Sequence, residues 1–294
     1  MLTLAHLSDP HLAPLPEPRW SELIGKRVTG YINWLRRRQF IHDPAVLSAI
    51  TADIRTQAPD HVAVTGDIAN IALPAEFPRG RDWLESLGSA RDVTFVPGNH
   101  DIYVREAGVL ATRQWGAYMS DDDGEGGFPF IRRRGNVALI GLSTGVPTAP
   151  FLATGWLGTK QLAEFAAILN KLKDEDFFRV ILIHHPPVSD AARHKRLMDA
   201  SILKRVIAAH GADLLLHGHD HLRMINWLHG PKGTRIPAVG VPSASSAPGR
   251  DKDAAGYNLY RIDGARGAWR CDMISRGFGS AGEIVQQDKI KLIG

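Results

Sequence analysis

The chain has 294 residues, which is long enough for one large domain or two modest ones. Hydrophobic residues make up 44% and charged residues 22%, which is typical of a globular protein and excludes a disordered or collagen-like chain. The 35 Lys and Arg residues exceed the 31 Asp and Glu residues by enough for a net charge of +4. This mild excess favours anionic ligands but does not choose among nucleotides, lipids and nucleic acid.

Cysteine content and the N-terminal sequence bear on the compartment. The single cysteine, Cys271, excludes an internal disulfide, as is usual in a reducing environment. The first residues, MLTLAHLSDPHL, lack the basic, then apolar, then small-residue order of a secretory signal. No apolar run approaches the roughly 18 residues of a membrane span. We therefore expect a cytoplasmic protein.

Short apolar runs recur in the first 220 residues, and their length and β-branched content predict buried strands. The runs are Leu2–Leu7, His61–Thr65, Val93–Val96, Val137–Leu142, Val180–Ile183 and Leu214–Leu216. Helices are expected between them at Asp43–Gln57, which opens on an Asp cap, at Leu162–Leu172, and from about Leu197 to His210. Strands that alternate with helices predict βαβ units and a largely parallel sheet.

After residue 220 the pattern changes. The segments MINWL, IPAVGV, YNLYRI and AWRCDMI are separated by glycine-rich turns and are typical of antiparallel strands. The whole pattern predicts two sheets in a single α/β domain over residues 1–275, with a C-terminal extension of undefined structure at 276–294. Two insertions, a basic and aromatic one at 17–40 and an acidic, then basic one at 119–134, are expected at the rim of the functional site.

Residues of the types that bind metals follow the apolar runs directly. In α/β sheets, ligands bind at the carboxyl ends of the strands, so five strands are expected to bring these side chains to one edge. In chain order the residues are Asp9 and His11, Gly66–Asp67, Gly98–Asn99–His100–Asp101, His184, and Gly218–His219–Asp220–His221.

The mixture of ligand types indicates the kind of metal. Imidazole nitrogen combined with carboxylate and amide oxygen suits divalent Mn, Fe, Zn or Co, and the lack of thiolate argues against a structural zinc site. Seven candidate ligands are too many for one ion but fit two ions that share a carboxylate. The elements D-x-H, G-D, G-N-H-D, H-H-P-P and G-H-x-H, in this order and each after an apolar run, are highly specific as a set.

This set of motifs, which spans residues 9–221, resembles that of the calcineurin-like metallophosphoesterases. The resemblance implies a four-layer α/β/β/α sandwich of two mixed sheets flanked by helices, and a dinuclear metal-dependent phosphoesterase. It further implies that His100 contacts the phosphoryl group as an imidazolium and that Asp101 orients His100 by accepting its other ring proton. One metal ion would be held by Asp9, His11 and His221, the other by Asn99, His184 and His219, and Asp67 would bridge them.

Two ligand choices remain open to alternatives. His184 is preferred to His185 because the ligand is expected directly after the strand, and His219 is preferred to His217. The remaining histidines, His42 among them, are expected to be structural or surface groups. The three glycines of these motifs are expected to permit tight turns where a side chain would crowd the metals; they are Gly66, Gly98 and Gly218.

Residues around the site would set its specificity, and the segment Trp20–Phe40 is the most informative. Such a basic amphipathic segment suits a cap on the core, a lid over an anionic substrate, or a peripheral membrane contact. Its apolar face is formed by Trp20, Leu23, Ile24, Val28, Tyr31, Trp34 and Leu35, and its basic residues are Lys26, Arg27, Arg36, Arg37 and Arg38. Further candidates for contact with the substrate are Tyr103, Arg105, Ser243 and Ser245.

The leading functional prediction is hydrolysis of a small phosphodiester, of the nucleotide or glycerophosphodiester kind, by metal-activated hydroxide, with phosphomonoesters as additional substrates. The alternative is a pyrophosphatase acting on a lipid such as UDP-diacylglucosamine at a membrane surface, which the 17–40 insertion would suit. A nucleic-acid substrate is not expected, because no basic stripe alternates with stacking aromatics. A non-catalytic scaffold is disfavoured because every ligand and His100 are present. The native metals and the oligomeric state are not predicted.

Overall fold

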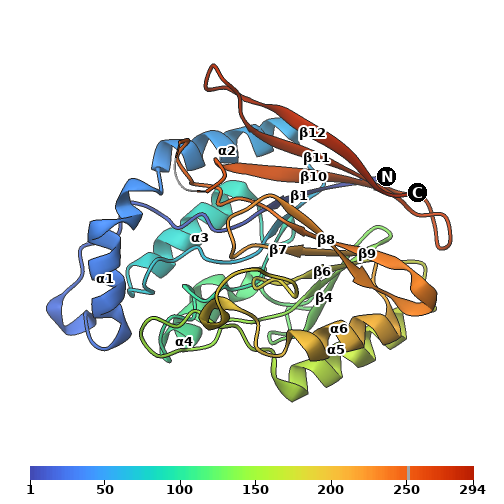
Figure 1. Cartoon of the computed structure of the whole chain (residues 1–294), viewed down its shortest axis with the longest axis horizontal. Helices are drawn as coiled ribbons and strands as arrows, with labels where there is room; N and C mark the ends of the chain where they lie inside the picture. The colour runs from blue at the N-terminus through green and yellow to red at the C-terminus, as the bar shows by residue number, and fades with distance from the viewer. Residues whose placement is uncertain (250–251) are drawn as a thin grey trace.

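The computed structural model describes residues 1–249 and 252–294 and contains two six-stranded sheets, one above the other, between layers of helices (Figure 1). The strand order is β12-β11-β10-β1-β2-β3 in the first sheet and β4-β5-β6-β7-β9-β8 in the second. Each sheet has a parallel part and an antiparallel part, because β10–β12 in the first and β4 and β8 in the second run against their neighbours. The predicted α/β/β/α sandwich of two mixed sheets is confirmed.

The predicted apolar runs all form strands, close to their expected bounds. The first sheet contains β1 (Leu2–Leu7), β2 (His61–Val64), β3 (Val93–Phe95), β10 (Gly256–Asp263), β11 (Arg270–Phe278) and β12 (Ile284–Ile293). The second contains β4 (Phe130–Arg134), β5 (Val137–Gly141), β6 (Phe178–Leu182), β7 (Leu214–His217), β8 (Met224–His229) and β9 (Arg235–Gly240).

Helix α2 begins where the local sequence satisfies a free amide and fixes the first turn. The Asp43 carboxylate accepts the backbone N–H of Ala45 at 2.8 Å, and Pro44 occupies the first helical position. The α-helices are α1 (Lys26–Arg36), α2 (Pro44–Gln57), α3 (Glu76–Leu87), α4 (Ala107–Trp115), α5 (Gly158–Leu172) and α6 (Ala200–His210). Short 3₁₀ turns include η1 (Trp20–Glu22), η2 (Arg38–Phe40) and η4 (Arg193–Lys195). In the described part of the chain, no helix combines the length and apolarity needed to cross a membrane.

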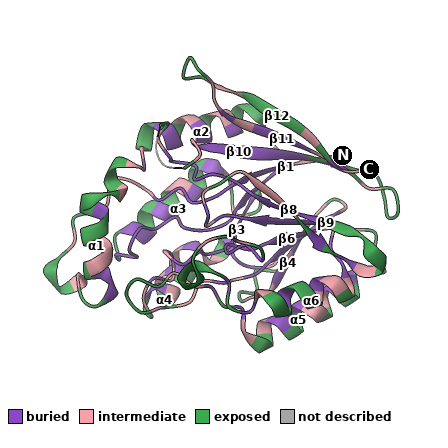
Figure 2. Cartoon of the chain, viewed as in Figure 1, coloured by how far each residue is buried: buried purple, intermediate pink, exposed green. Residues whose placement is uncertain are grey.

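The second sheet is buried on both faces, which explains its apolar runs. On β5, Val137 and Leu139 pack into the core shared with the first sheet, whereas Ala138 and Ile140 pack into the core beneath α5 and α6. Figure 2 shows the strands largely buried and the helices exposed on their outer sides. Because side chains of successive residues point to opposite faces of a strand, one uninterrupted apolar run serves two cores.

The C-terminal residues belong to the first sheet. β11 continues through residue 275 to Phe278, and β12 pairs with it as the edge strand. The segment 276–294, expected as an extension of undefined structure, is therefore part of the sandwich.

The insertion at 119–134 lies away from the functional edge, contrary to the expectation for it. Part of it forms the edge strand β4, and the Arg132 guanidinium donates to the carbonyls of Ala90 and Val93 at 2.6 and 2.8 Å. Those carbonyls stand at the beginning of β3, whereas Gly98–Asp101 follows its end. The segment is thus held at the amino ends of the strands.

Candidate metal centre

All seven predicted ligands meet at one cleft where strands of both sheets end. They follow β1, β2 and β3 of the first sheet and β6 and β7 of the second. The cleft has a volume of about 330 Å³ and is lined by both histidines of the last motif and by residues of the 17–40 insertion. Five loops that are distant in sequence therefore form one site.

One half of the site consists of Asp9, His11 and His221, whose possible ligand atoms lie within 4.8 Å of one another. Nε2 of His221 lies 3.0 Å from Oδ1 of Asp9 and 3.4 Å from Nε2 of His11. Asp9 and His11 are fully buried. Three converging donors of this chemistry fit a divalent ion.

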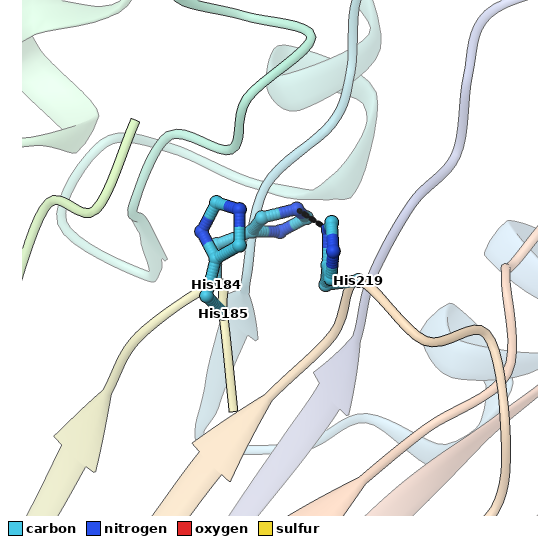
Figure 3. A group of neighbouring side chains, drawn as sticks. All are labelled: His184, His185 and His219. Carbon is cyan, nitrogen blue, oxygen red and sulfur yellow. Dashed lines mark hydrogen bonds between the residues drawn. The ribbon is translucent and has the colours of Figure 1, made fainter. Parts of the chain in front are cut away.

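The other half is built around His184. Its Nε2 lies 3.3 Å from Oδ1 of Asn99 and 3.3 Å from Nδ1 of His219, and Figure 3 shows the rings of His184 and His219 turned toward each other. Oδ2 of Asp67 lies 3.3 Å from Nε2 of His184 and 3.8 Å from Nε2 of His11. Asp67 thus stands between the two halves, as a bridging carboxylate must.

The two alternative histidines have partners elsewhere. Nδ1 of His185 lies 2.7 Å from Oγ1 of Thr144, and its Nε2 lies 3.1 Å from the carbonyl of Ala153. His185 is close to His219, with ring centroids 4.3 Å apart (Figure 3), but both its nitrogens are occupied. His217 is buried with Nδ1 against the carbonyl of Gly218. The geometry therefore favours His184 and His219 as ligands.

The second ring nitrogen of each of three ligand histidines is tied to a backbone carbonyl. This fixes the orientation of the ring and leaves the opposite nitrogen directed at the cluster, where it can bind a metal ion. Nδ1 of His184 donates to Thr65 at 2.6 Å, Nδ1 of His11 to Ala69 at 3.1 Å, and Nε2 of His219 to Lys195 at 2.8 Å.

The backbone at the ligands is strained. Five of the seven ligands have positive φ angles: Asp9 at 53°, His11 at 37°, Asp67 at 59°, His219 at 70° and His221 at 56°. Residues other than glycine rarely adopt this left-handed conformation, which costs on the order of 1–3 kcal/mol each and is concentrated at functional sites. In this strained conformation the five side chains point toward one another.

The motif glycines leave the space that these loops need. Gly66 has φ 99°, and a Cβ on it would lie 2.6 Å from both the backbone nitrogen of Gly98 and Nδ1 of His184. A Cβ on Gly98 would collide with the carboxylate of Asp67, and one on Gly218 with the hydroxyl of Ser8. The expected crowding beside the metal ligands is confirmed.

Without a metal ion, a proton on His184 balances the carboxylates. Burial opposes the charge, but the negative charge and hydrogen bond of Asp67 raise the pKa of His184 to about 10. Burial likewise opposes ionisation of Asp67, yet His184 holds the pKa of this carboxyl below its usual value. The cluster is therefore an acid–base pair in which a divalent cation would replace the proton.

Asp101 has a different role from the predicted one. Its Oδ2 accepts the backbone N–H groups of Asp67 and Gly98 at 2.7 and 2.9 Å, and its Oδ1 accepts that of Ala69 at 2.9 Å. The prediction that it accepts a ring proton of His100 is wrong, because that proton goes to the carbonyl of Asn70. Asp101 instead joins the loop after β2 to the loop after β3.

His100 lines the cleft beside the ligands. Its backbone N–H donates to Oδ1 of Asp67 at 2.8 Å, and its ring stacks on Tyr103 with centroids 5.5 Å apart. Burial and the neighbouring Arg38 lower the pKa of His100 to about 3. The predicted imidazolium is therefore absent from the metal-free and substrate-free chain, in which the ring is neutral.

Of the other candidates for substrate contact, only Tyr103 lines the cleft. Arg105 is exposed and is not among the described residues that line it. Ser243 and Ser245 are fully buried behind the ligands, where their hydroxyls bond with the carbonyl of Asp9 at 2.6 Å and with Nδ1 of His42 at 2.8 Å. These three predicted contacts are corrected, because neither buried serine has surface left for a substrate.

Helix α1 buries residues of both its basic and its apolar side. Lys26, Arg27 and Trp34 are buried, whereas most of the apolar face is exposed at the edge of the molecule (Figure 2). The exposed fraction is 89% for Trp20 and 71% for Ile24, and Val28, Ile32 and Leu35 continue the same side. Lys26 and Arg27 therefore face the protein together with Trp34 and the half-buried Leu23 and Tyr31, whereas Arg36 and Arg37 are exposed along with the other apolar residues.

Several residues at the site lack any signal in the motifs. Lys26 and Arg38 from the insertion line the cleft, as do Lys195 and Lys252 on other loops. His42, expected to be structural or on the surface, is buried with its ring centroid 4.5 Å from that of His11. The basic character of the insertion was the only hint, and it did not show which side chains point inward.

The fold and this site define a metallophosphoesterase. A family model described as calcineurin-like phosphoesterase matches residues 2–223, and the chain belongs to that family.

Individual relatives and solved structures share low sequence identity with this chain. A protein of Synechococcus sp. named "probable cyclic nucleotide phosphodiesterase" is 25% identical over 231 residues, which cover 76% of this chain and 79% of that protein. A dimetal phosphatase from Danio rerio has a similar structure, with a TM-score of 0.61, 16% identity, and coverage of 97% of this chain and 98% of the other. A purple acid phosphatase from yellow lupin (Lupinus luteus) seeds also reaches a TM-score of 0.61, with 12% identity over 99% of this chain and 53% of the other. The last two similarities support the fold.

Proposed function

We propose that the chain is a phosphodiesterase that uses two divalent metal ions. The residues that would hold them are Asp9, His11 and His221 for one, Asn99, His184 and His219 for the other, and Asp67 for both. The observation that carries this proposal is the position of Asp67, whose Oδ2 is within 4 Å of a ligand nitrogen of each half. A complete ligand set argues against a non-catalytic scaffold.

The size and lining of the cleft support an ester with two organic groups. About 330 Å³ falls within the range of small-ligand sites and leaves room beside the ligand cluster. Phe151 and Leu152 offer apolar surface on one wall. The Synechococcus relative, by its name, points to the same substrate class.

When bound, the ions would supply Lewis-acid activation of water and of a phosphoryl oxygen. The chain's own groups hold the reacting parts in position. Tyr103 and the carbonyl of Asn70 fix the ring of His100 at the cleft, where its Nε2, once protonated, would donate a hydrogen bond to the phosphoryl or leaving oxygen. Asp101 fixes the backbone that carries Asp67.

The test is a substrate screen on protein reconstituted with Mn, Fe, Zn or Co. Bis-p-nitrophenyl phosphate, p-nitrophenyl phosphate and cyclic nucleotides would be compared before and after chelation. We expect faster hydrolysis of the diester and loss of turnover in the chelated protein and in His219→Ala, but not in the control His229→Ala, which alters an exposed histidine on β8. A strong preference for the monoester would refute the diester assignment, and turnover in protein verified to be metal-free would refute the metal mechanism.

A second candidate, hydrolysis of a lipid-linked pyrophosphate such as UDP-diacylglucosamine, is favoured by the exposed apolar side of α1. Val28 and Ile32 are exposed on α1, and Trp20 and Ile24 are exposed just before it, in the same segment whose Lys26 and Arg38 line the cleft. An apolar strip of this kind suits insertion at the surface of a bilayer that contains the acyl chains of the substrate.

Vesicle binding separates the two candidates. A variant with Ile24, Val28 and Ile32 all changed to Ser would be sedimented with phosphatidylglycerol vesicles, beside the control Ile202→Ser on α6, which is 37% exposed compared with 43% for Ile32. If wild type and Ile202→Ser bind the vesicles and the triple variant does not, the lipid substrate is supported. Hydrolysis of the UDP-linked lipid by wild type would support it further. Equal lack of binding by all three proteins rejects it.

A further inference from the structure

Arg38 reaches the metal centre from the inserted segment. It begins the 3₁₀ turn η2, directly after α1, and its guanidinium lies between two loops that carry metal ligands. Nη1 lies 3.0 and 3.2 Å from the ring nitrogens of His100, and Nη2 lies 2.8 Å from Nδ1 of His11. A residue more than 60 positions before His100 thus touches it at the floor of the cleft.

Among the described residues Arg38 makes no direct ion pair with a carboxylate, although Asp67, Glu76 and Asp9 are near enough to attract its charge. Among the described residues, its direct partners are ring nitrogens and the carbonyl of Asn70, at 3.4 Å. The neighbouring Arg27 differs, because it pairs with Glu106 at 3.0 Å and donates to the carbonyl of Ala72 at 2.6 Å. A half-buried guanidinium without a direct ion pair has lost part of its solvation, and an anionic ligand in the cleft would replace it.

One terminal nitrogen of the guanidinium has an N–H group without an acceptor among the described residues. Nη2 carries two N–H groups, and its described partner is Nδ1 of His11, which lies 2.8 Å away and also 3.1 Å from the carbonyl of Ala69. Nη1 is directed at the ring of His100, where Nδ1 donates to the carbonyl of Asn70 and only Nε2 can accept. The second N–H of Nη2 can therefore donate to a ligand in the cleft.

A second cation extends the positive wall. Nζ of Lys26 lies 4.2 Å above the ring of Tyr103, which in turn stacks on His100. The same ammonium donates to Oγ1 of Thr148 at 2.6 Å and to the carbonyl of Leu152 at 3.0 Å. The inserted segment therefore places two cations on the side of the cleft that His100 occupies.

We propose that Arg38 is a catalytic residue that donates hydrogen bonds to the phosphoryl group of the substrate beside His100. This inference rests on the proposed phosphoesterase function. A planar guanidinium suits two phosphoryl oxygens at once, and donors aimed at developing negative charge lower the barrier to phosphoryl transfer. The insertion thus completes the active site in addition to covering it.

The experiment compares Arg38→Ala, Arg38→Lys and the control Arg36→Ala, which alters an exposed arginine of the same segment. Three quantities are measured on metal-reconstituted protein: metal content, affinity for inorganic phosphate by calorimetry, and kcat/KM for bis-p-nitrophenyl phosphate. We expect Arg38→Ala to keep its metal, to bind phosphate about 10- to 100-fold more weakly, and to lose roughly 100- to 1,000-fold in kcat/KM. Arg38→Lys should recover only part of the loss, added guanidinium should restore turnover of Arg38→Ala, and Arg36→Ala should behave as wild type.

The outcomes separate this inference from the proposed function. Unchanged phosphate affinity and turnover in Arg38→Ala would overturn it, and so would loss of metal from this variant, since Arg38 would then act by supporting His11. A third outcome is that wild type hydrolyses no phosphoester, while Arg38→Ala still binds phosphate more weakly than wild type. That result would support the Arg38 contact and reject the proposed function.

Discussion

Removal of the Asp101 carboxylate should lower the free energy of unfolding of the protein and also impair the site. This side chain is fully buried and accepts three backbone N–H groups, from Asp67, Ala69 and Gly98. Asp101→Ala would leave all three without an acceptor, at about 1–3 kcal/mol each. The three groups lie together, so water that enters can serve more than one of them, and we expect a total loss of about 3–5 kcal/mol.

The two carboxylate oxygens allow a graded test. Oδ2 accepts two of the three N–H groups and Oδ1 accepts one. In Asp101→Asn, the amide oxygen can take the place of Oδ2 and keep the two hydrogen bonds from Asp67 and Gly98. This variant should therefore lose only about 1–2 kcal/mol of stability. Against a total stability of roughly 5–15 kcal/mol, the difference between the two variants is easily measured.

The assay is urea unfolding of the metal-free protein, so that loss of metal does not contribute to the result. Metal content and turnover are then measured separately on reconstituted protein. If Asp101→Ala unfolds within about 1 kcal/mol of wild type and only its turnover falls, the three backbone bonds are not its main role.

Three further predictions concern the metal centre and the insertion. Asp67→Ala should lose bound metal and at least about 1,000-fold in turnover, since one carboxylate serves both halves, and full activity in a verified variant would contradict the centre. Metal binding at pH 8 should release about one proton from His184, whose pKa is lowered by burial but raised by Asp67 to a final value of about 10. Metal affinity should therefore rise with pH up to that value. Calorimetry in buffers of different ionisation enthalpy measures the released proton, and no release would count against His184 as a ligand. Gly30→Ala should destabilise the protein by about 1–3 kcal/mol, because its Cβ would lie 2.6 Å from Oη of Tyr103, whereas Gly108→Ala, with nothing within 4 Å, should be neutral or stabilising in the same thermal unfolding assay.

Helix α1 shows that a periodic pattern does not by itself determine which side chains are buried. Its apolar residues recur at helical spacing, which ordinarily marks the face that packs on the core. Here Lys26 and Arg27 face the protein because carbonyls, Glu106 and the cleft offer them partners. The periodicity identifies a two-faced helix, but the partner surface determines which face is turned inward.

The sequence by itself determined the strands and the metal-type ligands, because both depend on local order. A ligand placed directly after a buried strand, as Asp9 follows β1 and His184 follows β6, is carried to the edge of the sheet wherever the rest of the chain goes. Only the tertiary structure decided the place of Arg38 and the hydrogen bonds of Asp101, because each depends on a contact between segments that no spacing rule relates. The motifs therefore define the reaction centre, and the packing of the insertion against it defines the surface that a substrate meets.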